Sequence, residues 1–193
     1  MKHVGKSYDK VDAKGILSGK PSYTGDFVPK DALIIKVLRS PHAQARIKSI
    51  DTSKAKLIPG VEAIFTYEDV PNTRFTLAGQ TYPEPSAYDA LILDPVVRYV
   101  GDEVALVVAK DEATALKAMP LIKVEYEVQK PVLDLRTAMD HETVVHPEDD
   151  ILNHIPVGQD YKRNICVSYH KRVGDIEAEL AKCDYVVEGT YFD

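Results

Sequence analysis

The histidines and carboxylates between positions 140 and 170 are the residues whose types could do chemistry. His141 and His146 flank a glutamate in an order that suggests two metal ligands on one helix. Such ligands must lie four residues apart, and five residues apart they diverge by about 140°. The intervening Thr-Val-Val favours a strand, in which residues five apart face opposite sides. We therefore expect His141, His146 and His154 to be loop residues and not metal ligands.

Two further patterns in this region fail on geometry. Glu148, Asp149 and Asp150 offer carboxylate oxygens to calcium, but an EF-hand needs ligands at alternate positions and a glycine inside the loop. Cys166 and His170 could form a nucleophile pair, yet on a strand residues four apart are separated by about 13 Å. We expect a solvated acidic loop and no nucleophile pair.

The other charged residues and the cysteines that could form a site are more simply explained as structural or solvent-exposed residues. Arg98, Asp102 and Glu103 gather at one expected turn and could line a site, although the charged ends of hairpins are commonly solvated. Two cysteines are too few for a disulfide scaffold, a four-cysteine metal site or an iron–sulfur cluster. We expect Cys166 and Cys183 to be reduced structural thiols, with Cys183 a small buried side chain.

The sequence contains none of the common cofactor or nucleophile motifs. Its ten glycines never occur as Gly-x-Gly, which excludes the dinucleotide fingerprint, and there is no phosphate-binding loop. A Gly-x-Ser-x-Gly nucleophile elbow is also missing. We therefore assign no catalytic, cofactor-binding or metal-binding residue from spacing.

Composition limits the partners of the chain. The 193 residues are 45% hydrophobic and 28% charged, the balance of a globular protein, and the net charge is −6. Nucleic acid is not an expected partner, because it requires a basic face. No stretch approaches the roughly 20 apolar residues of a membrane span, and no apolar leader follows Met1. We expect a cytoplasmic location.

Hydrophobic periodicity predicts short strands and short helices in an α+β arrangement. The first thirty residues form an expected arm, and residues 71–90 form a long surface loop. Three short helices are expected, with N-caps at Thr52 or Ser53, at Asp111 and at Asp175. The helix after Asp111 would place Ala115, Leu116 and Met119 on one face. The predicted strands are 33–39, 45–51, 61–66, 96–100, 104–109, 121–128 and 185–192.

Two of these predictions concern chain connectivity. Gly101-Asp102 lies between two β-branched runs and predicts a tight hairpin, because glycine adopts the positive φ that such a turn needs. The sequence ends on an apolar strand, whose exposed edge invites association. We therefore expect that the chain is truncated.

The amino-acid sequences of these segments, and their order along the chain, resemble those of the xanthine dehydrogenase and aldehyde oxidase family. The longest match is similar to the family pattern S-P-H-A-x-A-R-I-x-S-I-D-x-S-x-A. The resemblance covers about residues 5–192, and Pro120 departs from it where the family helix continues. The matching segments are 15–26 (GILSGKPSYTGD), 40–55 (SPHAQARIKSIDTSKA), 59–66 (PGVEAIFT), 69–71 (DVP), 99–109 (YVGDEVALVVA), 124–127 (VEYE), 174–175 (GD) and 188–191 (EGTY).

The resemblance implies an α/β hammerhead with a mixed β-sheet and short packing helices. It places the hammerhead and its arm at 1–133, and the start of the molybdopterin-binding region at 134–193. It further implies an oxidoreductase that hydroxylates a purine, another heterocycle or an aldehyde with water-derived oxygen. Molybdopterin, 2Fe-2S clusters and FAD are implied for the full enzyme, carried by the rest of the large subunit and by iron–sulfur and FAD subunits or domains. No catalytic or cofactor residue is transferred to this chain.

Two alternatives stay open at this stage. A non-redox carrier or ligand-binding module would need a modified lysine at a hairpin tip, where this chain has Gly101-Asp102. A self-sufficient hydrolase or metalloenzyme would use the histidines of residues 141–170. A protein mass that includes a carrier modification would support the first, and one tightly bound zinc ion would support the second.

Overall fold

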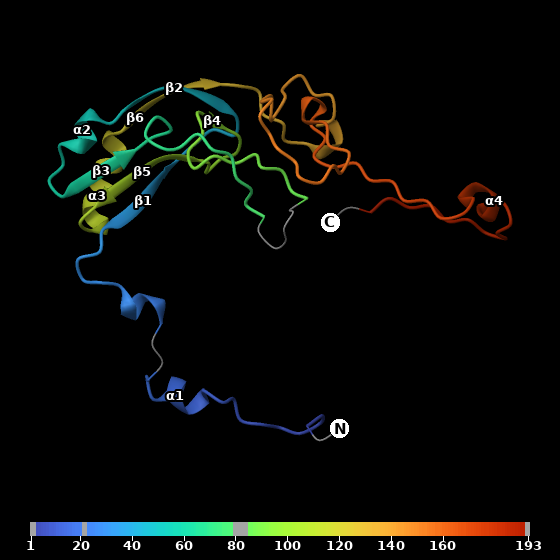
Figure 1. Ribbon diagram of the computed structural model, residues 1–193, viewed down its shortest axis with the longest axis horizontal. Helices are drawn as coiled ribbons and strands as arrows, with labels where there is room; N and C mark the ends of the chain where they lie inside the picture. The colour runs from blue at the N-terminus through green and yellow to red at the C-terminus, as the bar shows by residue number, and fades with distance from the viewer. Residues whose placement is uncertain (1–2, 21–22, 79–84, 192–193) are drawn as a thin grey trace. The chain divides into compact units, whose positions relative to one another are not determined.

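The computed structural model describes residues 3–20, 23–78 and 85–191 (Figure 1). Pro21, Ser22, Pro83, Phe192 and Asp193, which belong to segments discussed above, lie outside the described residues. The elements are α1 (Ala13–Leu17), η1 (Thr24–Phe27), β1 (Ile34–Arg39), β2 (Ala45–Asp51), α2 (Ser53–Lys56), β3 (Val61–Phe65), β4 (Val96–Val97), β5 (Glu103–Ala109), α3 (Glu112–Ala118), η2 (Met119–Leu121), β6 (Lys123–Val128), η3 (Leu135–Thr137), η4 (Tyr161–Arg163) and α4 (Ile176–Leu180).

In the described residues, six strands form two three-stranded sheets, one in the order β1-β5-β3 and the other in the order β4-β2-β6. Strands β2 and β4 run antiparallel, with Ala45 opposite Val97 and Arg46 opposite Val96. The α+β class is confirmed, and five of the predicted strands lie at their expected positions as β1, β2, β3, β5 and β6. Strand β4 is shorter than its predicted range of 96–100.

The predicted hairpin around Gly101-Asp102 is wrong, because β4 and β5 belong to different sheets. Gly101 does adopt a positive φ of 101°, as the turn prediction requires. Its N–H, however, donates to the carbonyl of Ser40 at 2.8 Å, and the N–H of Ser40 donates back to the carbonyl of Asp102 at 2.8 Å. The turn is therefore bonded to the segment after β1 and does not close a two-stranded ribbon.

The contacts of the chain divide it into two compact units, of which the first contains residues 1–37, 51–64 and 106–123. In this unit α2, α3 and η2 contact one another. Many of its buried side chains are small: Ala55, Val107, Ala109, Ala115 and Ala118 are fully inaccessible to solvent, and the larger Ile64 and Ile122 are 4% and 6% exposed. Alanine lets helices and strands approach closely, and the apolar area that all of these side chains bury stabilises the unit.

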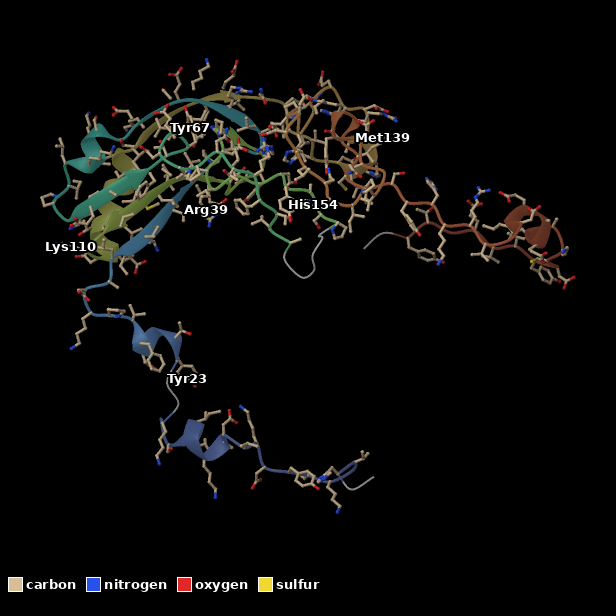
Figure 2. All side chains as sticks on the ribbon, in the orientation of Figure 1. Tyr23, Arg39, Tyr67, Lys110, Met139 and His154 are labelled. Carbon is tan, nitrogen blue, oxygen red and sulfur yellow. The ribbon has the colours of Figure 1, made fainter. Side chains whose placement is uncertain are left out.

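The second unit contains residues 38–50, 65–105 and 124–193 and has its own hydrophobic core. Ala45 and Ile47 alternate with exposed residues along β2, as the period-two pattern predicts. They pack with Val97 and Val104, and partly buried side chains surround this cluster. These surrounding side chains are Leu38, Ile50, Tyr67, Val124 and Tyr126 (Tyr67 is labelled in Figure 2).

Helix boundaries follow their capping residues. The Asp111 carboxylate accepts the N–H of Thr114 at 2.7 Å, and the Asp175 carboxylate accepts the N–H of Ala178 at 3.0 Å, so both predicted caps are confirmed. Thr52 makes no side-chain cap bond. The apolar face predicted for α3 is partly wrong, because Leu116 is exposed while Thr114 and Ala115 are buried.

Both ends of the described chain carry exposed apolar side chains. Val11, Leu17 and Phe27 of the amino-terminal arm are 104%, 88% and 73% exposed, as expected for an arm that buries nothing by itself. The predicted strand over 185–192 is wrong for its described part, since residues 185–191 have no regular structure. A strand needs a partner ladder, and none of the described segments supplies one. No described helix has the length and hydrophobicity to cross a bilayer.

Candidate functional site

The Arg98 guanidinium, one residue after β4, is largely buried and donates several hydrogen bonds. Only 11% of its side chain is exposed. It donates to Asp94 at 2.8 Å, to Glu148 at 2.5 Å and to the carbonyl of Val145 at 3.1 Å. Burial lowers the pKa of Arg98, but the charges of Asp94 and Glu148 outweigh burial and leave that pKa above its usual value. Arg98 therefore ties residues 145–148 to the end of β4.

The charged cluster predicted at Arg98, Asp102 and Glu103 is divided in the structure. The Asp102 carboxylate accepts the backbone N–H groups of Arg98 and Glu103 at 2.7 and 3.0 Å, and burial raises its pKa. Glu103 instead pairs with Arg39 at 2.8 Å and accepts the hydroxyl of Tyr99 at 3.2 Å (Arg39 is labelled in Figure 2). These bonds stabilise the turn and leave no shared site.

His146 lies between two carboxylates. Its Nδ1 is 3.4 Å from Glu148 Oε2, and its Nε2 is 3.9 Å from Asp89 Oδ2. Among the described residues neither His146 Nδ1 nor Glu148 Oε2 has a hydrogen-bond partner, although both atoms are buried. Burial raises the pKa of Glu148, but the neighbouring imidazole and the positive charge of Arg98 outweigh burial and lower the pKa to about 2. Glu148 is therefore a permanent anion at neutral pH.

A cavity of about 600 Å³ opens beside His146 within the second unit. Its volume lies in the range of small-molecule sites, and its walls are mostly aliphatic. The polar groups on its lining include Asp89, His146, Tyr161 and Asn164. Its aliphatic wall includes Val132, Ala138, Val145, Val157 and Val167.

Asn164, which the sequence analysis did not single out, organises the wall of this cavity. It adopts the left-handed conformation, with φ of 59°, and its carboxamide oxygen accepts the N–H of Val145 at 2.8 Å. Its carboxamide nitrogen donates to the carbonyls of Ala138 and Thr143, both at 2.9 Å. Asparagine tolerates this conformation, and Asn164 follows a short run of polar residues, but such a signal is common in loops.

Arg74 is a second residue that sequence reasoning missed. Its side chain is only 10% exposed, and it donates to the Asp150 carboxylate at 2.8 Å and to the carbonyl of Asp89 at 2.8 Å. Arg74 therefore fixes the loop after β3 to the acidic segment. No spacing rule could reveal this pair, because its members are 76 residues apart.

The acidic run at 148–150 is distributed over three cations and does not converge on one point. Each carboxylate has its own basic partner at hydrogen-bond distance, so the arrangement offers calcium no shared set of oxygens. The three pairs are Glu148 with Arg98 at 2.5 Å, Asp149 with Lys162 at 2.7 Å, and Asp150 with Arg74 at 2.8 Å.

The three loop histidines have separate environments. His141 Nδ1 accepts the N–H of Thr143 at 3.0 Å, whereas the ring of His154 meets Tyr88 edge-on at 4.8 Å between ring centroids (His154 is labelled in Figure 2). His146 has the contacts described above. Within the described residues, no three histidine, cysteine, aspartate or glutamate side chains are grouped so as to hold a metal ion.

Both cysteines are free and exposed. Cys166 lines the cavity, and His170 is exposed farther along the chain. The prediction that Cys183 is buried is wrong: its sulfur lies 3.4 Å from the carbonyl of Glu179, beside a helix that buries none of its residues. A cysteine between a helix and a strand is buried only where the two pack together, and here the strand does not form.

A second hollow, of about 500 Å³, lies beside β2 and is more polar. Gln44 is buried on its wall, and its carboxamide nitrogen lies 3.5 Å from the carboxamide oxygen of Gln129. Lys130 forms an ion pair with Glu142, while Arg46 is exposed. The hollow therefore presents the exposed guanidinium of Arg46, whereas Lys130 pairs with Glu142 and Gln44 contacts Gln129.

Comparison with known proteins identifies the fold family. The family model described as "Aldehyde oxidase and xanthine dehydrogenase, a/b hammerhead domain" matches residues 18–130. The chain is 40% identical to the probable hypoxanthine oxidase XdhD of Escherichia coli K12, over 97% of this chain and 22% of that protein. It is 32% identical to the xanthine dehydrogenase molybdenum-binding subunit of Escherichia coli O157:H7, over 94% of this chain and 23% of that subunit.

The solved structures agree with the sequence matches. Quinoline 2-oxidoreductase from Pseudomonas putida 86 is similar with a TM-score of 0.60 and 35% identity, over 69% of this chain and 17% of that one. The chain spans about a fifth of the length of these two Escherichia coli relatives. The chain belongs to the aldehyde oxidase and xanthine dehydrogenase family, and its residues 18–130 are the α/β hammerhead domain of that family.

Proposed function

We propose that this chain is the hammerhead portion of the molybdenum-binding large subunit of an oxidoreductase that hydroxylates a purine, another heterocycle or an aldehyde. Its role is to fold and to pack against the rest of that subunit, and it contributes no catalytic group. The observation that carries the proposal is the coverage: 97% of this chain matches 22% of a probable hypoxanthine oxidase. Another relative is named as a large molybdopterin subunit.

The described residues do not fit the molybdenum–pterin cofactor that the family implies. A pterin phosphate requires cations or several free N–H donors. Asp89 instead places a carboxylate on the lining of the larger cavity, where the described residues include no lysine or arginine. Among the described residues that line the smaller hollow, Arg46 offers an exposed guanidinium, whereas Lys130 is paired with Glu142. We therefore place the cofactor on the remainder of the large subunit and derive no chemical step from this chain.

A packing role explains the exposed apolar side chains at both ends of the chain. Tyr185, Val187 and Tyr191 are 90%, 94% and 92% exposed, a pattern typical of surfaces that another polypeptide covers. The same holds for the amino-terminal arm, where Val11 and Leu17 are more than four-fifths exposed. Burial of these side chains against the rest of the subunit would stabilise the assembly by about 25 cal/mol per Å² of apolar area.

The proposal extends to organisation, partners and location. The hammerhead and its arm occupy residues 1–133, and residues 134–193 lead into the molybdopterin-binding region. Iron–sulfur and FAD subunits or domains carry electrons away from the site in the full enzyme. The two free thiols support a reducing compartment, the cytoplasm.

The experiment that tests the proposal is a segment exchange in XdhD of Escherichia coli K12, where the matching segment is 40% identical. The segment is replaced by this chain, and the molybdenum content of the purified chimera is measured by mass spectrometry. We expect the chimera to retain molybdenum, because the exchanged segment packs and does not ligate.

Two companion proteins make this exchange decisive. XdhD lacking the segment is expected to be unstable and free of molybdenum, and this chain supplied in trans is expected to restore part of the loss. A folded chimera without molybdenum, alongside parent XdhD that contains it, contradicts the proposal.

A further inference from the structure

We infer that the cavity beside His146 is a docking site for a segment of the remaining large subunit that inserts an aliphatic side chain next to a basic one. This inference rests on the proposed function, since it names the surface by which the hammerhead portion joins its partner. The cavity of about 600 Å³ is larger than any single side chain, and the described residues leave it open.

The apolar character of the wall defines one half of the expected occupant. Val132, Val145 and Val157 contribute aliphatic surface to the lining, and Val167 at the edge is 54% exposed. Exposure of such a wall to water is unfavourable. Covering it with an aliphatic side chain is favourable by about 25 cal/mol per Å² of apolar surface removed from water.

The negative charge on the lining defines the basic half of the expected occupant. Asp89 carries the only carboxylate on the described lining, and its side chain is 39% exposed. Among the described residues the group that faces this carboxylate is the His146 imidazole, whose Nε2 at 3.9 Å is too distant for a hydrogen bond. The carbonyl of Asp89 accepts a hydrogen bond from Arg74 at 2.8 Å, which fixes the backbone that carries this carboxylate. An arriving lysine or arginine would complete the pair.

A polypeptide segment explains the surroundings better than a small molecule does. Exposed apolar side chains continue past the cavity: Leu152, whose carbonyl accepts the N–H of Tyr88, is 52% exposed, and Tyr169 is 76% exposed. A small ligand would leave these side chains in water. About four-fifths of the length of the two Escherichia coli relatives lies outside the matched segment, so a covering chain of sufficient length exists in them.

Cys166 provides a probe for the occupant, because it lines the cavity and is exposed in this chain. The experiment compares maleimide labelling of Cys166 in the isolated chain with labelling in the complete large subunit, using peptide mass spectrometry. We expect labelling in the complete subunit to be at least about tenfold slower, because access then requires local opening. Equal rates in the two proteins would overturn the inference.

Charge reversal at the mouth of the cavity gives the second arm of the experiment. In the complete subunit, Asp89→Lys is expected to accelerate Cys166 labelling at least about tenfold, since it repels the inserted basic residue. The matched control is Asp149→Lys, which changes a carboxylate that is 92% exposed and is not on the lining, and it should change the rate less than about twofold. Equal effects of the two substitutions would overturn the inference.

The remaining outcomes separate this inference from the proposed function. The molybdenum content of the unmodified complete subunit tests only the proposed function. If molybdenum is present and Cys166 is still labelled rapidly, the docking site is wrong while the function stands. If Cys166 is protected in the isolated chain by a small molecule that native mass spectrometry detects, the cavity is a ligand site and the docking inference is overturned.

Discussion

At the scale of single residues, the stability of the second unit depends on charges held away from water. Arg98, Asp94 and Glu148 form a chain of ion pairs whose side chains are 11–20% exposed. Such groups stabilise the fold only while each has its partner, because an unpaired buried charge costs several kcal/mol. This cluster is therefore where single substitutions should have large effects.

Replacing the central cation tests this argument. Arg98→Ala leaves Glu148 and Asp94 without their positive partner, and we expect the free energy of unfolding to fall by about 3 kcal/mol. The matched control is Arg136→Ala, since Arg136 pairs with Asp134 but its side chain is 67% exposed; that variant should lose less than about 0.5 kcal/mol. Urea unfolding followed by circular dichroism measures both values, and equal losses would contradict the role of Arg98.

Acid titration tests Glu148 itself. Because its pKa falls from 4.5 to about 2 in the folded chain, its charge stabilises the fold above pH 4.5, and this contribution disappears as the pH falls toward 2. The loss should be about 3 kcal/mol. Asp102 acts in the opposite direction, because burial raises its pKa.

The comparison with Glu148→Gln isolates the contribution of Glu148. The variant should be less stable than the parent near neutral pH, and the difference in unfolding free energy should shrink steadily between about pH 5 and pH 2. A difference that stays constant over this range would mean that Glu148 is not held as an anion by Arg98.

At the scale of elements, the helices differ in how much they contribute to the fold. Helix α3 buries Thr114, Ala115 and Ala118, whereas α4 buries none of its residues. Both begin with an aspartate that accepts a backbone N–H, so the local chemistry of the two caps is the same. Their effect on global stability should therefore depend on packing alone.

The two caps form a matched pair of substitutions. Asp111→Ala should reduce the free energy of unfolding by about 1 kcal/mol, because α3 unfolds with the core of its unit. Asp175→Ala should leave the cooperative unfolding transition unchanged, since α4 frays independently. Thermal unfolding by calorimetry measures both, and a comparable loss for Asp175→Ala would show that α4 is packed.

Substitution of Gly158, which lies between η3 and η4, tests how tightly the backbone packs beside the cavity. Gly158 has a φ of 72°, and an added Cβ would lie 2.2 Å from the carbonyl oxygen of Ser168. Gly101 also has a positive φ, but an added Cβ meets no atom within 4 Å. Gly101→Ala should therefore cost about 1 kcal/mol from backbone strain alone.

Gly158→Ala should cost more than Gly101→Ala, because the backbone of Ser168 must move and its N–H bond to the carbonyl of Val157 is disturbed. Chemical denaturation gives the two costs, and amide exchange at Ser168 reports the local bond. Equal costs and unchanged exchange at Ser168 would show that the wall accommodates the added methyl group without strain.

At the scale of the whole molecule, local patterns predicted most elements but not their partners. The alternation along residues 45–51 and the cap at Asp111 correspond directly to β2 and α3. The hairpin at Gly101-Asp102 failed because glycine specifies a turn without specifying which strand pairs next. The strand over 185–192 failed for its described part because its partner is not among the described segments, and strand propensity alone does not form a ladder.

The candidate site was less predictable than the fold. His146 and the acidic run were visible as residue types, but Arg74 and Arg98 neutralise that run across 76 and 50 residues of sequence. Long-range pairs of this kind leave no periodicity, so spacing rules could not reveal the cavity. The family resemblance supplied what the spacing could not, and the match over residues 18–130 confirmed it.

The most direct test of the account is the molybdenum content of this 193-residue chain, expressed alone in a host that makes molybdopterin. The account predicts a folded protein whose molybdenum, measured by inductively coupled plasma mass spectrometry, does not exceed that of an unrelated control protein. Stoichiometric molybdenum that remains bound through gel filtration would contradict it, because the described residues would then hold the cofactor without the rest of the large subunit.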